Sequence, residues 1–162
     1  MTRLLRMVAF ESAVFLFSLS AWAGAIPDCI SKGVPITVDN QAVIDMKTST
    51  PNQYLARAHV SGVLNSIYKD QSGHNHFSVK IGSDSRDTIE VVYNFSFGKL
   101  PTLRVGMTIE ACGDFINSFS PTSQYPVSPD GAIVHWVHKN PKPSGHESGY
   151  VVIDGVLFGQ GN

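Results

Sequence analysis

The sequence predicts an all-β protein, a small barrel of five or six strands that follows an N-terminal arm. After residue 54, short segments in which apolar and polar residues alternate recur along the chain, which is typical of half-buried strands. Turn residues such as Gly, Pro, Asn and Ser separate these segments. No long segment has the apolar spacing of an amphipathic helix. This pattern favours a small barrel or a sandwich.

The barrel domain is expected to cover residues 55–162. In its first strand, Gly62 predicts a bend or bulge, which a sheet needs where it curls into a barrel. In the preceding arm, residues 24–54, only Gln41–Met46 offers a turn of helix. The expected strands lie at 54–68, 75–81, 88–95, from Met107 onward, at 132–138 and at 150–157.

The segment that leads into the fourth strand narrows the choice among small all-β folds. A long connector ends in RVGMTIEACGDF, residues 104–115, where a β-branched residue and a glycine precede an alternating strand. This arrangement resembles the fourth strand of a five-stranded OB-type barrel. The likeness concerns the fold and carries no function by itself. The loop that follows, residues 118–130, is rich in Ser and Pro.

The N-terminus has the pattern of a secretory signal peptide. Arg3 and Arg6 precede an apolar run at residues 12–22, and small residues at an Ala-x-Ala spacing follow it. We expect residues 1–23 to be removed, with cleavage near Ala23 or Ala25, and the protein to be periplasmic or secreted. The alternative is an uncleaved anchor, but the apolar run is shorter than the roughly 20 residues that span a bilayer.

The charge balance excludes one class of partner. The chain has 12 Lys and Arg against 13 Asp and Glu, a net charge of −1 with neutral histidine, and no block of like charge. Strong binding to duplex nucleic acid is not expected, because that binding relies on neutralising phosphates with Lys and Arg. We expect no membrane attachment after cleavage of the signal peptide, and a monomer.

Two cysteines remain after cleavage, Cys29 in the arm and Cys112 in the fourth strand. An even number of cysteines in an exported chain favours a disulfide, which would tie the arm to the sheet. The alternative is a pair of metal-binding or reactive thiols. Neither cysteine has the CxxC spacing or the adjacent histidine that would favour that alternative.

Two motifs resemble those of a family of small exported bacterial proteins. The segment GAIVHWVHKNPKPSGHESGY, residues 131–150, is similar to the family's H-W-x-H and H-x-x-G-aromatic signature, and SGHNHF, residues 72–77, is similar to its Ser-x-His. The resemblance implies an OB-like barrel with a site at these motifs, and it names no reaction. The matching residues are His74, His135, Trp136, His138, Asn140, Pro141, His146, Gly149 and Tyr150.

The chain departs from this family pattern at three positions. Tyr93 and Lys139 stand where the family often has histidine, and Gly145 stands where it often has arginine. A site built entirely from histidines, or one that depends on positive charge, therefore has fewer of its usual groups here.

Four histidines are the candidate metal ligands: His74, His135, His138 and His146. Neutral imidazoles bind zinc and other divalent transition metals, and three or four of them can form a site. In a regular strand His135 and His138 point to opposite faces, so they can share a ligand only if the strand twists or bulges. The alternative interpretation is structural, with the histidines hydrogen-bonded to backbone or capping the turn.

Further binding residues are expected beside these histidines: Tyr93, Asn94, Trp136, Glu147 and Tyr150. Together they predict a binding module for a divalent transition metal such as zinc or for a small polar ligand. An OB-type barrel that binds an oligosaccharide or a single-stranded oligonucleotide without metal is an alternative. A third hypothesis is a metal-dependent hydrolase, such as a phosphodiesterase or nuclease, with Glu147 as base. The scarcity of Lys and Arg favours the binding module.

Overall fold

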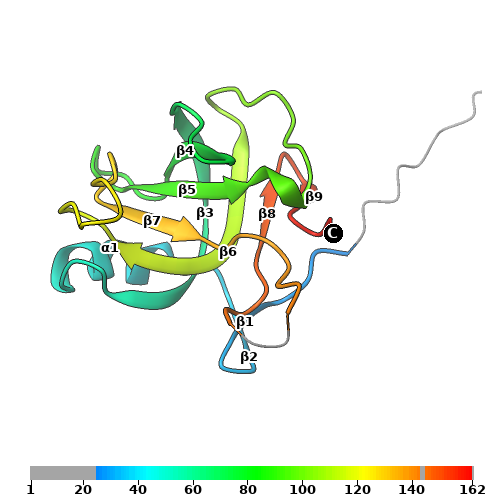
Figure 1. Ribbon diagram of the computed structural model, residues 1–162, viewed down its shortest axis with the longest axis horizontal. Helices are drawn as coiled ribbons and strands as arrows, with labels where there is room; N and C mark the ends of the chain where they lie inside the picture. The colour runs from blue at the N-terminus through cyan, green and yellow to red at the C-terminus, as the bar shows by residue number, and fades with distance from the viewer. Residues whose placement is uncertain (1–24, 143–144, 162) are drawn as a thin grey trace, which may run out of the picture.

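The computed structural model of the protein describes residues 25–142 and 145–161 (Figure 1). The predicted signal peptide therefore lies outside the described residues. Nearly all regular structure is β, as the sequence predicts, with one α-helix and one short 3-10 helix. Within the described residues, no helix combines the length and apolarity needed to cross a membrane.

Five strands form a closed barrel in the order β3-β4-β5-β7-β6, and β6 pairs back onto β3. The pairing is antiparallel except between β5 and β7, which run parallel. This topology is that of the small OB-like barrel predicted from the sequence. The strands are β3 (Leu55–Ile67), β4 (His74–Lys80), β5 (Thr88–Asn94), β6 (Thr108–Asn117) and β7 (Ala132–His135).

The barrel closes because β3 bends and pairs with two strands. Its first part pairs with β6 as far as Val63, and from Val63 onward it pairs with β4. At Gly62 a Cβ atom would lie 2.0 Å from the carbonyl oxygen of Lys80, so only glycine fits where the backbones approach. The register also shifts between Leu64 and Ser66. The predicted bend at Gly62 is therefore confirmed.

The remaining elements lie around the barrel: β1 (Cys29–Ser31), β2 (Val34–Ile36), α1 (Asn40–Ser49), η1 (Phe95–Phe97), β8 (Tyr150–Ile153) and β9 (Val156–Phe158). Figure 1 shows α1 against the barrel and the β1–β2 hairpin outside it. The helix is longer than Gln41–Met46. The Asp39 side chain accepts a hydrogen bond from the backbone N–H of Ala42 at its start, and Val43 packs into the core.

Two predicted strands end earlier than expected. The strand predicted at 132–138 ends at His135, because Trp136 adopts a left-handed backbone with φ of 51° that cannot continue a strand. The strand predicted at 150–157 is a hairpin, β8–β9, because Asp154 and Gly155 have φ of 48° and 80°. An Asp-Gly pair between apolar segments is a strong hairpin signal.

Alternation along the strands separates a core face from an outer face. In β4, Phe77 and Val79 are buried in the core, so His74, His76 and Ser78 face outward. In β5 and β7 the same parity places further polar groups outside the barrel. The outer face of β4, β5 and β7 is the surface on which the candidate site lies.

A disulfide joins Cys29 to Cys112, as predicted, with the two Cα atoms 5.6 Å apart. It fixes the β1–β2 hairpin to β6, and both cysteines are buried with Tyr150 and Val152 in a second apolar cluster. A stable disulfide is typical of proteins from oxidising compartments.

Replacing both cysteines, Cys29→Ala with Cys112→Ala, should lower the free energy of unfolding. The bridge joins residues 83 apart, and closing a loop of that length stabilises by about 4 kcal/mol in the chain-entropy model. Urea unfolding of the double variant and of the oxidised wild type measures the difference. The reduced wild type should match the double variant, and an unchanged urea midpoint on reduction would contradict the prediction.

Candidate functional site

The four predicted histidines lie together where β4 begins and β7 ends. His74 opens β4 and His135 closes β7, and their ring centroids are 5.5 Å apart. His138 and His146 come from the loop between β7 and β8, and their centroids are 5.1 Å apart. The four side chains thus form two pairs, which we call the sheet pair and the loop pair. The four residues together are the histidine cluster.

Trp136 connects the two pairs. Its ring centroid lies 4.8 Å from that of His135 and 5.4 Å from that of His146, on which it stacks. Its left-handed backbone ends the strand, so the parity rule that would separate His135 from His138 no longer holds. At the far side of the loop pair, Phe97 stacks on His138 at 3.7 Å.

Three rings of the cluster have a defined tautomer. In His74, Nδ1 lies 2.9 Å from the carbonyl oxygen of Ser72. In His138, Nδ1 lies 2.9 Å from the carbonyl oxygen of Lys139, and in His146 it lies 2.8 Å from the carbonyl oxygen of Glu147. A carbonyl oxygen only accepts, so Nδ1 carries the hydrogen in each ring. The neutral ring then has its lone pair on Nε2, and none of these Nε2 atoms hydrogen-bonds to another described residue.

His135 is held in its neutral form. Burial, followed by the nearby His74, His138, His146 and His76, lowers the pKa of His135 to about 4. Burial also lowers the pKa of His138, against the opposing effect of its hydrogen bond to Lys139. Both shifts favour the neutral imidazole, so His135 and His138 present lone pairs rather than positive charge.

The spacing within each pair suits two imidazoles that share an ion. With a metal–nitrogen distance near 2.0–2.1 Å and tetrahedral angles, two bound rings have centroids about 5 Å apart. Both pairs have about this spacing. Within residues 25–142 and 145–161, however, no three His, Cys, Asp or Glu side chains are already arranged to hold one ion.

The sequence interpretation missed two residues beside the cluster, His76 and Glu90. The ring of His76 lies 6.4 Å from that of His74, and its Nδ1 is 2.7 Å from Oε1 of Glu90. Glu90 is only 6% exposed, and Ser128 donates to its other oxygen at 2.6 Å. The His-x-His spacing in a strand was the available signal, since residues two apart share a face.

Three predicted binding residues have other roles in the structure. Tyr93 points into the core and donates to the Gly98 carbonyl oxygen, and burial raises its pKa. Asn94 is paired with His74 across the sheet and caps the short helix η1 through the N–H of Ser96. Tyr150 lies away from the histidine cluster, buried beside the disulfide.

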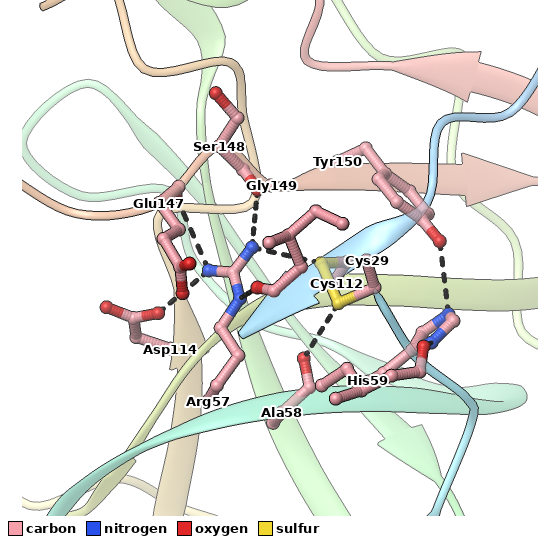
Figure 2. The surroundings of a disulfide bond; sticks show 12 residues. Cys29, Arg57, Ala58, His59, Cys112, Asp114, Glu147, Ser148, Gly149 and Tyr150 are labelled. Carbon is pink, nitrogen blue, oxygen red and sulfur yellow. Dashed lines mark hydrogen bonds and ion pairs between the residues drawn. A yellow bond between two sulfur atoms is a disulfide. The ribbon is translucent and has the colours of Figure 1, made fainter. Parts of the chain in front are cut away.

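The surroundings of Tyr150 form a closed polar network of their own. Its hydroxyl lies 3.1 Å from Nε2 of His59 (Figure 2). The hydroxyl donates to Oε1 of Glu110, and the same carboxylate oxygen lies 2.9 Å from Nε2 of His59. Burial, reinforced by Glu110, raises the pKa of Tyr150. Nδ1 of His59 is bonded to the Ile36 carbonyl oxygen, so both nitrogens of this ring are occupied.

Arg57 ties the arm to the loop that carries His146. Its side chain is 5% exposed and pairs with Asp114 at 2.8 Å (Figure 2). The same guanidinium donates to the carbonyl oxygens of Ile30 in β1 and of Glu147 and Ser148 in the loop. The Glu147 carboxylate, a predicted binding group, instead accepts from the Gly33 N–H of the hairpin.

The comparisons with known proteins add no relative: no family model matches the chain, and no curated protein matches it. The family resemblance of the C-terminal segment therefore remains an expectation from the sequence.

The neutral state of His135 should make stability depend on pH. The unfolded chain binds a proton at His135 near pH 6.5, whereas the folded protein does so only near pH 4. The free energy of unfolding therefore has its full value above pH 6.5 and decreases as the pH falls toward 4, because the unfolded chain binds the proton first. At 1.4 kcal/mol per pKa unit, less an allowance for partial exposure, the loss is about 2 kcal/mol.

Urea unfolding at pH 7 and pH 4.5 measures this loss. The wild type should lose about 2 kcal/mol more over this interval than His135→Asn, which has no group to titrate. Equal losses in the two proteins would contradict the pKa of His135 given above.

Proposed function

We propose that this protein is an exported binding module whose histidine cluster holds a divalent transition-metal ion. The observation that carries the proposal is the orientation of the imidazoles. In His74, His138 and His146, Nδ1 donates to a backbone carbonyl oxygen and Nε2 has its lone pair free of described partners. Metal-binding histidines almost always have this arrangement, in which the outer nitrogen is tied to an oxygen.

The electrostatics of the site support a cation as the ligand. Burial favours the neutral form of His135 and His138. The outer face of the neighbouring strands adds the carboxylates of Glu90 and Asp130, which bond to His76 and Ser78. Lone pairs and carboxylates attract metal ions and repel phosphates. Neutral imidazoles suit zinc, copper, nickel and iron.

The position of the cluster on the fold supports a binding role. In OB-type barrels, the outer face of the second and third strands and the adjacent loops commonly bind ligands. Those strands are β4 and β5 here, and His74 and Asn94 mark their ends at the cluster. The half-buried rings of Trp136 and His135 border the same face.

Calorimetric titration of the mature protein with Zn²⁺ at pH 7.5 tests the proposal. We expect saturable binding that weakens as the pH falls through about 6.5, because ligand histidines must be deprotonated. His135→Ala should weaken binding at least about tenfold, which equals 1.4 kcal/mol.

His59→Gln is the matched control, because both nitrogens of His59 are already occupied outside the cluster. It should leave the zinc affinity unchanged. The proposal fails if the wild type binds no Zn²⁺, Cu²⁺ or Ni²⁺, or if His59→Gln and His135→Ala weaken binding equally.

A further inference from the structure

The outer face of the barrel brings a third imidazole to the sheet pair. His76 pairs with Val92 across β4 and β5, and the parallel register of β5 and β7, continued by one residue, places His135 on the other side of Val92. His74 lies one step along the same face, 5.5 Å from His135 and 6.4 Å from His76 between ring centroids. His76 and His135 therefore flank Val92, and His74 lies beside both of them.

The buried carboxylate of Glu90 is hydrogen-bonded to His76. Glu90 accepts from Nδ1 of His76 and from the Ser128 hydroxyl, so each of its oxygens has a donor. The Ser128 hydroxyl oxygen in turn accepts from the N–H of Asp130, which holds this part of the loop over β5. Glu90 is thus held by two donors, and its bond to Nδ1 of His76 leaves Nε2 as the lone-pair nitrogen of that ring.

The same fold contains a second Glu–His pair, which shows what a purely structural pair looks like. In the pair of His59 with Glu110, the glutamate bonds Nε2 and a backbone carbonyl oxygen bonds Nδ1. In the pair of His76 with Glu90, only Nδ1 is bonded among the described residues. His59 has no nitrogen left for a ligand, whereas His76 has one.

We propose that His74, His76 and His135 together hold the metal ion, with Glu90 as the carboxylate that orients His76 and raises its basicity. This inference rests on the metal binding proposed above. It places the ion at the sheet pair rather than at the loop pair of the cluster, and it adds His76, which lies beside the cluster, as the third ligand. The three side chains are not arranged around one point in the described structure, so they converge by rotation about their side-chain bonds. Three protein ligands leave a fourth position of a tetrahedral ion for water or an exogenous anion.

Zn²⁺ titration of Glu90→Gln and Glu110→Gln tests the role of Glu90. Glutamine keeps the size of the side chain and an oxygen that can accept from His76, but it removes the negative charge. Loss of such an outer carboxylate typically weakens metal binding roughly 10- to 100-fold. Glu90→Gln should do so, and the matched control Glu110→Gln should bind as the wild type does. Equal affinities of the two variants would overturn the role of Glu90.

Ligand replacements test the location. His76→Gln should lose binding, whereas the loop-pair variant His138→Ala with His146→Ala should bind within about tenfold of the wild type. The opposite result would overturn the three-histidine site and leave metal binding by the cluster intact. No metal binding by the wild type would overturn both proposals. Should Glu90→Gln fail to fold, His76→Gln retains Glu90 and still decides the location.

The Co²⁺-loaded protein tests the open position. Its visible spectrum reports the ligands of the ion, and azide should change that spectrum in the wild type and in the loop-pair variant. A spectrum that azide leaves unchanged at saturating concentration would overturn the open fourth position.

Discussion

The bend of β3 at Gly62 is the constraint on which the rest of the structure depends. Because β3 pairs with β6 before the bend and with β4 after it, the sheet closes on itself. Closure brings β7 between β5 and β6, and the parallel pairing of β5 with β7 follows from that position. Without it, His74 and His135, which are 61 positions apart in sequence order, would have no common face.

Arg57 supplies the second constraint, because the described residues of the loop between β7 and β8, 136–142 and 145–149, contain no strand. One guanidinium joins β1, β6 and the backbone of Glu147 and Ser148. The backbone at Gly149 then passes so close to Cys112 that a Cβ atom would lie 2.3 Å from the Cys112 carbonyl oxygen. The disulfide and the loop that carries His146 are therefore fixed by the same small group of atoms.

The sequence predicts the barrel well because each strand has a clear alternation and a turn at its end. It also predicts the disulfide, since only two cysteines remain in the expected mature chain. The end of β7 could not be predicted, because a tryptophan inside AIVHWVH has no intrinsic preference for a left-handed backbone. In that conformation its ring packs between those of His135 and His146, a tertiary contact that the local sequence does not encode.

The same limit applies to the site. The sequence identifies the histidines because several of them occur close together. It also places Tyr93 and Tyr150 with them, which is wrong because alternation does not reveal which face of a strand is the interior. Tyr93 belongs to the core and Tyr150 to the disulfide cluster. His76 and Glu90 are 14 positions apart, and their pairing depends on the β4–β5 register, which a single sequence leaves open.

A comparison within the protein bears on what the cluster is for. A histidine that only stabilises a fold should satisfy both ring nitrogens, and His59 does so with Ile36 and Glu110. The cluster instead places several half-buried rings so close together that the pKa of His135 falls to about 4. Such crowding lowers stability at acidic pH and leaves lone pairs without described partners. Crowded titratable groups and polar atoms without partners are most common at functional sites, where a ligand completes the missing interactions.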